Sequence, residues 1–138
     1  METNNVRSLL EQLEAKGWTI DYIRKFLNEV AVKKILGKLG LNKSIPGYNY
    51  LVCIILCYID DCTIREKSSE KIYDMIANVY QATKSSVQND IRSCITFVWE
   101  GENRSIIKNI FRKKPKMKEF ITIIGEEVKN KKRMRTNG

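Results

Sequence analysis

The stretch from Tyr73 to Arg92, YDMIANVYQATKSSVQNDIR, combines regularly spaced apolar residues with a run of polar ones. Its apolar and small residues are spaced to hold two helices together at a tight turn: Ile76, Ala77, Tyr80, Ala82, Val87 and Ile91. The outer side of the second helix carries hydrogen-bond donors and acceptors, and we predict that these residues read bases: Lys84, Ser85, Ser86, Gln88, Asn89 and Arg92. Arg92 can bind guanine O6 and N7, and Gln88 or Asn89 can bind adenine N6 and N7, in the major groove.

The start of the second helix offers a cap and a phosphate contact. The Thr83 hydroxyl can cap this helix while a nearby backbone N–H binds a DNA phosphate. The turn position usually given to glycine, because it favours positive φ, holds Gln81 here. The pattern alone leaves open an alternative, in which these are two ordinary amphipathic helices with a polar outer face.

The positive charge is concentrated at one end of the chain. The 138 residues include 25 Lys and Arg against 16 Asp and Glu, a net charge of +9. The last 35 residues, from Arg104, carry twelve Lys and Arg against three Asp and Glu, and therefore supply the whole excess. Such a concentration favours a polyanion as partner, although the final run from Lys129 to Arg135 alone also fits a solubilising tail. We predict that these residues contact the DNA backbone: Thr83, Arg104, Lys108, Arg112, Lys113, Lys114 and Lys116.

The composition excludes several classes of function. The chain has no His, so the commonest general base and metal ligand are missing, along with the Ser/His and Cys/His nucleophile pairs. The four cysteines form no CxxC pair, and we expect free, buried thiols with no metal or cofactor. The adjacent acids Asp60 and Asp61 fit a solvated turn or a helix cap better than a catalytic pair. We therefore expect a protein that is not an enzyme.

The spacing of apolar residues predicts an all-α, multi-helix bundle that contains the helix-turn-helix. Helices are expected near residues 6–13, 19–36, 48–59, 68–80, 85–100, 105–112 and 116–129, the third of them central and buried. We predict an N-terminal helical arm or hairpin over residues 1–37, an effector domain over 38–129 and a basic disordered tail over 130–138. Trp99 is expected in the core, and Trp18 at the start of a helix.

No segment is predicted to cross a membrane. The longest apolar run, Tyr50 to Ile59, is about half of the roughly 20 residues that a span requires. The N-terminus mixes charges with apolar residues from the start, unlike a secretory signal. A cytoplasmic protein is therefore expected.

The segment from about Leu39 to Lys129 resembles the C-terminal DNA-binding domain of a bacterial sporulation response regulator, stage zero sporulation protein A. The resemblance rests on four motifs in the same order: IPGYNYL from Ile45, IYDMIA from Ile72, SSVQNDIRSCI with VW from Ser85, and KPKMKEFI from Lys114. It implies an all-helical effector domain with a recognition helix in the major groove of double-stranded DNA. It also implies tandem copies on promoter DNA that contact the sigma subunit of RNA polymerase.

Two departures from the family pattern limit which properties of the family can be expected of this chain. The family's recognition helix resembles SRVERAIR, so that its Arg, Glu and Arg fall on Ser86, Gln88 and Asn89, whereas its final Arg matches Arg92. The mode of binding is therefore expected to persist, but not the DNA target sequence. The family also places a phosphorylatable receiver, on the order of 120 residues, upstream. Only about 37 residues precede the matching region here, so we expect no control by aspartyl phosphorylation.

Two functions of different classes follow from these patterns. The first is a sequence-specific, double-stranded DNA-binding transcriptional regulator without a receiver. The second is a protein-interaction module that antagonises a full-length regulator or polymerase without specific DNA binding, since three charges are missing from the recognition helix. In either case, we expect the N-terminal helices to form a homodimer or to bind a regulator.

Overall fold

The computed structural model describes the backbone of residues 8–137 apart from 10, 13 and 18, and the side chains of the same residues as far as 130. Every regular element in this part of the chain is helical, which confirms the predicted all-α class. Residues 8, 9, 11, 12, 14 and 15 are helical, and they are followed by α2 (Ile20–Lys38), α3 (Tyr48–Asp60), a 3₁₀ helix η1 (Cys62–Glu66), α4 (Ser69–Tyr80), α5 (Lys84–Glu100), α6 (Arg104–Ile110) and α7 (Met117–Asn137).

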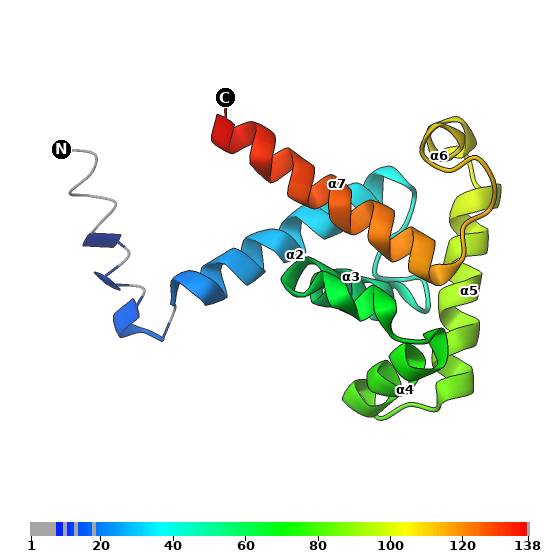
Figure 1. Cartoon of the computed structure of the whole chain (residues 1–138), viewed down its shortest axis with the longest axis horizontal. Coiled ribbons are helices and arrows are strands. Elements are labelled where there is room, and N and C mark those ends of the chain that lie inside the picture. Colours follow the sequence, from blue (N-terminus) through cyan, green and yellow to red (C-terminus); the bar gives the residue numbers. More distant parts are fainter. Residues whose placement is uncertain (1–7, 10, 13, 18, 138) are drawn as a thin grey trace.

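Helix α3 is the centre of the bundle, as its nearly continuous apolar sequence predicts. Six of its thirteen residues are buried, and it packs against α2, α4, α5 and α7 (Figure 1). Glycine permits two of these close approaches. A Cβ on Gly47, which precedes α3 at φ +91°, would collide with the Asp90 carbonyl oxygen of α5, and a Cβ on Gly125 of α7 would collide with the Tyr58 ring.

Helices α4 and α5 form the predicted helix-turn-helix. Ile76 and Ala77 of α4 and Val87 and Ile91 of α5 are all buried, so these four predicted residues hold the two helices together. Ala82 is only half-buried, and Tyr80 is 41% exposed and packs edge-on against Tyr50 of α3 instead. Gln81 occupies the turn in the left-handed conformation, with φ 55° and ψ 41°, and its backbone N–H donates to the Ala77 carbonyl oxygen. The turn therefore has the usual geometry without the usual glycine.

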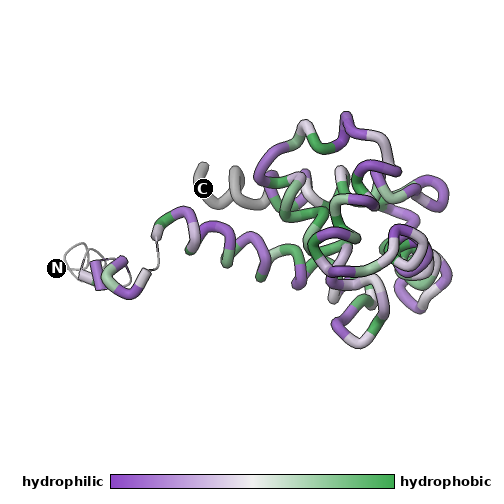
Figure 2. The backbone as a smooth tube through the Cα atoms, turned by 90° about the horizontal axis from the view of Figure 1, so that it is seen from below, coloured by the Kyte–Doolittle hydropathy of each residue, from purple (hydrophilic) through white to green (hydrophobic). Residues whose placement is uncertain are grey.

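Helix α2 belongs to two environments. Val32, Ile35 and Leu36 near its C-terminal end lie in the core, so the folded unit begins before residue 38, where the sequence placed the domain boundary. Its first half extends away from the body on the side opposite α5 (Figures 1 and 2). The described residues before Thr19 are all exposed. A hairpin between this first segment and α2 therefore stays a prediction.

The C-terminus differs from the sequence-based prediction. Helix α7 continues to Asn137, whereas a helix ending at Lys129 and a disordered tail from residue 130 were expected. The run KNKKRMRTN contains neither proline nor glycine, and Lys, Arg and Met have high helix propensity, so nothing in it ends a helix that tertiary packing has already started.

Candidate nucleic-acid interface

Capping fixes the start of the predicted recognition helix. The Thr83 hydroxyl oxygen accepts a hydrogen bond from the Ser86 backbone N–H at 3.1 Å. Helix α5 begins at Lys84, one residue earlier than the sequence indicated. Because Thr83 satisfies one N–H of the first turn, the remaining N–H groups of that turn point outward, where a helix N-terminus favours an anion.

The polar edge of α5 faces outward. Thr83, Ser85, Ser86, Asn89 and Arg92 are exposed, and Lys84 and Gln88 are half-buried. The opposite side of the helix, with Val87, Ile91 and Cys94, is buried. The Cys94 thiol donates to the Pro46 carbonyl oxygen at 2.9 Å, and burial raises its pKa to about 11. The predicted base-reading residues therefore lie on the outer surface of a helix whose inner surface is fixed in the core.

A groove joins the polar edge of α5 to the loop before α7. It has a volume of about 610 Å³ and is lined by α4, α5 and that loop. Gln88 and Arg92 lie on one wall, and Lys114 and Lys116 lie on another. The Lys114 ammonium donates to the Thr96 hydroxyl of α5 at 2.6 Å, while Pro115 and Met117 are buried and hold the loop against the body. The fold thus brings together four of the predicted site residues that are far apart in the sequence.

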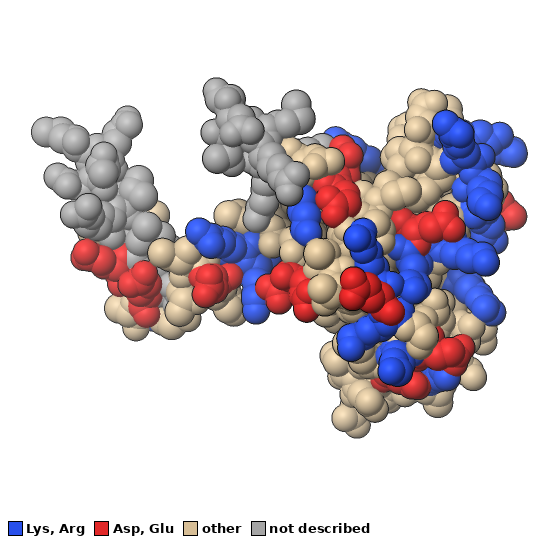
Figure 3. Space-filling view, in the orientation of Figure 1, with Lys and Arg blue, Asp and Glu red and all other residues tan. Residues whose placement is uncertain are grey.

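The remaining predicted backbone contacts lie further along the same edge. Arg104 and Lys108 are exposed on α6, and Arg112 and Lys113 are exposed in the segment that follows it. Figure 3 shows Lys and Arg side chains gathered along the side of the molecule formed by α5, α6 and the loop that leads to α7. These four residues do not line the groove, so they form a basic flank beside it.

An ion pair within this surface was missed by the sequence interpretation. The Lys84 ammonium is paired with the Glu70 carboxylate in the first turn of α4. The hydrogen bond from Lys84 to Glu70 raises the pKa of Lys84, and the charges of Asp74 and Glu70 add to the effect. An acid in the first turn of a helix is common because it suits the helix dipole. Nothing in the spacing of residues 70 and 84 indicates that they meet.

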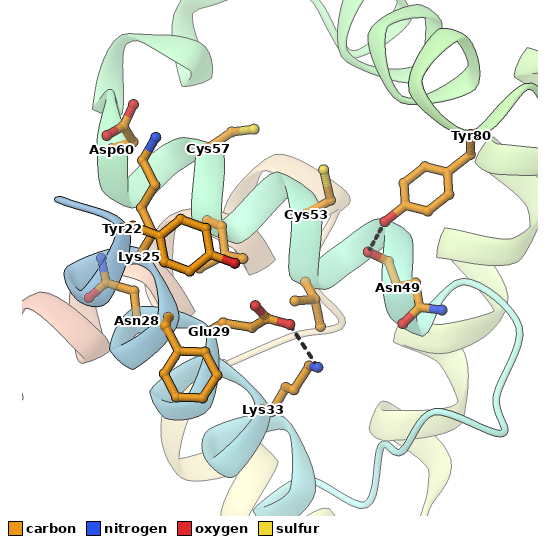
Figure 4. Close-up of a pocket in the computed structure, with 13 residues that line it drawn as sticks. Tyr22, Lys25, Asn28, Glu29, Lys33, Asn49, Cys53, Cys57, Asp60 and Tyr80 are labelled. Carbon is orange, nitrogen blue, oxygen red and sulfur yellow. Dashed lines mark hydrogen bonds and ion pairs between the residues drawn. The ribbon is translucent and has the colours of Figure 1, made fainter. Parts of the chain in front are cut away.

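A second hollow, of about 460 Å³, lies between α2, α3 and the end of α4 (Figure 4). Cys53 and Cys57, one helical turn apart on α3, are among its lining residues. The hydrogen bond between the two thiols lowers the pKa of Cys57 to about 7 and raises the pKa of Cys53. The Tyr80 hydroxyl donates to the Asn49 carbonyl oxygen at 3.3 Å, so the end of α4 closes this hollow on one side.

The cysteines and acids only partly follow the sequence interpretation. Cys94 is buried and Cys53 and Cys57 are half-buried, but Cys62 is exposed because it starts the 3₁₀ helix at the surface. The Asp61 carboxylate accepts hydrogen bonds from the backbone N–H of Thr63 at 3.0 Å and from its hydroxyl at 2.6 Å, and these bonds lower the pKa of Asp61. Asp61 is therefore the helix cap that the sequence favoured.

Trp99 is half-buried and packs against the core, as expected, whereas Trp18 lies outside the described residues. Within the described ranges, no three His, Cys, Asp or Glu side chains are grouped as a metal site requires. In the same part of the chain, no helix is both long and apolar enough to cross a membrane.

The first half of α2 presents a different kind of surface. Large apolar side chains are about half exposed there: Ile20 48%, Tyr22 54%, Phe26 50%, Leu27 55% and Val30 50%. They lie on the turns before the part of α2 that enters the core. An exposed apolar surface of a few hundred Å² is comparable with the largest patch on many monomeric proteins, and such patches are often functional.

Comparison with known protein families agrees with the resemblance seen in the sequence. The model of one family, described as the C terminal of the sporulation initiation factor Spo0A, matches residues 32–137. The matched range begins at Val32, the first core residue of α2, and includes the helix-turn-helix, the groove and the basic flank.

Proposed function

The chain belongs to the family of Spo0A C-terminal domains, which are DNA-binding effector domains of a sporulation response regulator, and on this basis we propose how its residues bind DNA. The N-terminal end of α5 enters the major groove, where the polar edge from Ser85 to Arg92 meets the base edges. Lys114 and Lys116 bind phosphates beside this contact, and the basic flank follows the DNA backbone. The family is one of DNA-binding domains rather than enzymes.

The observation that carries this proposal is the groove in which Gln88 and Arg92 of α5 meet Lys114 and Lys116. Base edges and phosphates lie close together along a major groove, so a protein that reads DNA needs hydrogen-bonding side chains and cations on one surface. The groove combines hydrogen-bonding side chains with cations. The inner side of α5 is buried, so this surface is held rigidly.

Selection of bound sequences from random duplex DNA at near-physiological salt tests the proposal. We expect a defined motif with an enriched guanine. Arg92→Ala should then cost about 1–3 kcal/mol on the selected site and relax the preference for that guanine. Lys114→Ala should weaken binding to all sequences alike and lower the salt slope by about one.

Comparing Arg92→Ala with Lys114→Ala distinguishes recognition of the base sequence from attraction to DNA of any sequence. Equal losses for Arg92→Ala on the selected site and on random DNA would contradict base reading by Arg92. A selection without any enriched motif would contradict sequence-specific binding as a whole and favour the protein-interaction function.

A second proposal concerns self-association, and the exposed face of α2 favours it. Ile20, Ile23, Leu27 and Val30 are spaced three and four residues apart, as in the seam of a coiled coil. These four side chains expose roughly 300–350 Å² per copy, so two copies bury about 650 Å² together, below the usual size of a specific interface and in the range of a weak one. We therefore propose a weak homodimer through α2 that strengthens binding to adjacent DNA sites.

Sedimentation equilibrium over a range of concentrations tests this pairing. Leu27→Glu should make the protein monomeric while leaving binding to a single DNA site unchanged. Val79→Glu, at a position on α4 that is 66% exposed, is the matched control and should leave the dimer intact. A protein that is monomeric at every concentration would contradict self-association. Capture of a purified sigma subunit that Leu27→Glu abolishes would instead assign this face to polymerase.

A further inference from the structure

The ion pair between Lys84 and Glu70 lies within the proposed DNA-binding surface. Its side chains are 39% and 60% exposed, so the pair is at the surface rather than in the core. Exposed pairs contribute little to stability, and α4 and α5 are already held together by buried apolar side chains. The fold does not need this pair, which makes its position within the interface informative.

Lys84 occupies the position where a cation would bind DNA most readily. It is the first residue of α5 and follows the cap Thr83, where the outward N–H groups of the first turn also favour an anion. The residues that follow it on the reading edge are neutral: Ser85, Ser86, Gln88 and Asn89. An unpaired ammonium here would add a phosphate contact on DNA of any sequence.

Glu70 occupies the same surface from the neighbouring helix. It lines the groove that contains Gln88, Arg92 and Lys114, and Asp74, one turn further along α4, is also close enough for its charge to act on Lys84. The Lys84 ammonium is therefore held by the Glu70 carboxylate, and the charge of Asp74 adds to the attraction. With its charge compensated, the first two turns of α5 form a reading edge that is electrically neutral as far as Arg92.

We infer that Glu70 masks Lys84, so that Lys84 supports the positioning of the recognition helix and contacts neither bases nor phosphates in the DNA complex. This inference rests on the proposed function and changes one part of the sequence-based assignment, which placed Lys84 among the base-reading residues. The first two turns of α5 then select DNA through neutral hydrogen bonds, Arg92 adds the charged base contact, and the general attraction to DNA comes from the basic residues of the groove and flank.

The test is a double-mutant cycle on the full chain, with affinity for the selected site and for random duplex DNA measured at several salt concentrations. Glu70→Gln should release Lys84, steepen the salt slope by about one and raise affinity for both DNAs about fivefold near 0.15 M salt. Lys84→Gln alone should change neither the slope nor the ratio of the two affinities. The double variant should return to the wild-type slope.

Glu127→Gln is the matched control, because Glu127 is exposed on α7 and does not line the groove. It removes the same charge and should leave the salt slope unchanged. Three outcomes overturn the masking role of Glu70. They are a lower affinity ratio for Lys84→Gln, an unchanged salt slope for Glu70→Gln, and a steeper slope for Glu70→Gln that persists in the Lys84→Gln background. The last would mean that the change in slope does not come from Lys84. A chain that binds no duplex DNA would overturn the proposed function as well.

Discussion

The outer edge of α5 and the first half of α2 are both exposed, but they are exposed in different ways. The edge of α5 presents hydroxyl, amide and guanidinium groups on a helix whose other side is buried. The first half of α2 presents large apolar side chains on a segment whose anchoring in the core begins only at Val32. Exposure alone therefore does not identify a partner. Polar groups on a fixed helix suit base edges, and apolar groups on a projecting helix suit protein.

The largest expected contrast between the two regions is in stability. Ile91→Ala, on the buried side of α5, should lower the free energy of unfolding by about 2–5 kcal/mol, because it leaves a cavity in the core. Leu27→Ala, on the exposed face of α2, should change it by less than about 0.5 kcal/mol. Urea unfolding of both variants measures the contrast. Equal losses would mean that the first half of α2 folds as part of the core.

A second contrast is in thiol reactivity. Cys57, in the hollow beside α2, has a pKa of about 7, whereas burial raises the pKa of Cys94 on α5 to about 11. Since the thiolate is the reactive form, Cys57 should be alkylated about a hundredfold faster than Cys94 at pH 7. The rate at Cys57 should fall as the pH drops below about 7.

Peptide-resolved mass spectrometry after timed alkylation measures both rates. Cys53→Ala provides the control, because removing the hydrogen-bond donor should shift the pH midpoint of Cys57 toward the ordinary thiol value. A midpoint that stays near 7 in this variant would show that another group stabilises the thiolate.

A third contrast compares two equivalent caps. Thr83 caps α5 and Thr19 caps α2, and in each case the threonine hydroxyl accepts a backbone hydrogen bond at 3.1 Å. Thr83→Ala should lower the free energy of unfolding by about 1 kcal/mol, since α5 unfolds with the core. Thr19→Ala should have a smaller effect, because the projecting end of α2 can fray locally. Urea denaturation of the two variants measures both changes. A larger loss of stability for Thr19→Ala than for Thr83→Ala would contradict this prediction.

The smallest expected effect is at the turn of the helix-turn-helix. Gln81 has φ 55°, a conformation that is strained for any residue with a Cβ. Gln81→Gly should therefore raise the free energy of unfolding by about 0.5 kcal/mol, because relief of the strain exceeds the added freedom of glycine in the unfolded chain. Thermal unfolding measures the change. Destabilisation by glycine would show that contacts of the Gln81 side chain outweigh the strain.

Much of the fold could be predicted from local patterns. The apolar run of α3 indicated a buried central helix, and the spacing of Ile76, Ala77, Val87 and Ile91 indicated the helix-turn-helix, because each signal is contained within a few helical turns. The end of α7 was predicted less well. The high positive charge of this run is typical of a disordered tail, but its Lys, Arg and Met residues also favour a helix. The helix continues because the preceding turns of α7 are already packed on the core.

Only part of the candidate site could be predicted from the sequence. The reading edge of α5 could be predicted because it is a single helix face. The groove could not, because it depends on the loop at Lys114 lying against Thr96, and the compensation of Lys84 could not, because Glu70 comes from another helix. Contacts between elements depend on how the helices cross, which residue spacing within one helix does not encode.

The helical class, the position of the helix-turn-helix and the concentration of positive charge after Arg104 follow from the amino-acid sequence alone. These are properties of spacing and composition. The tertiary structure alone decided which cations meet the reading edge, which lysine is paired with an acid, and which half of α2 is buried. The physical reason is distance: charge pairing and burial act over a few ångströms in space, and the fold sets those distances between residues that are remote along the chain.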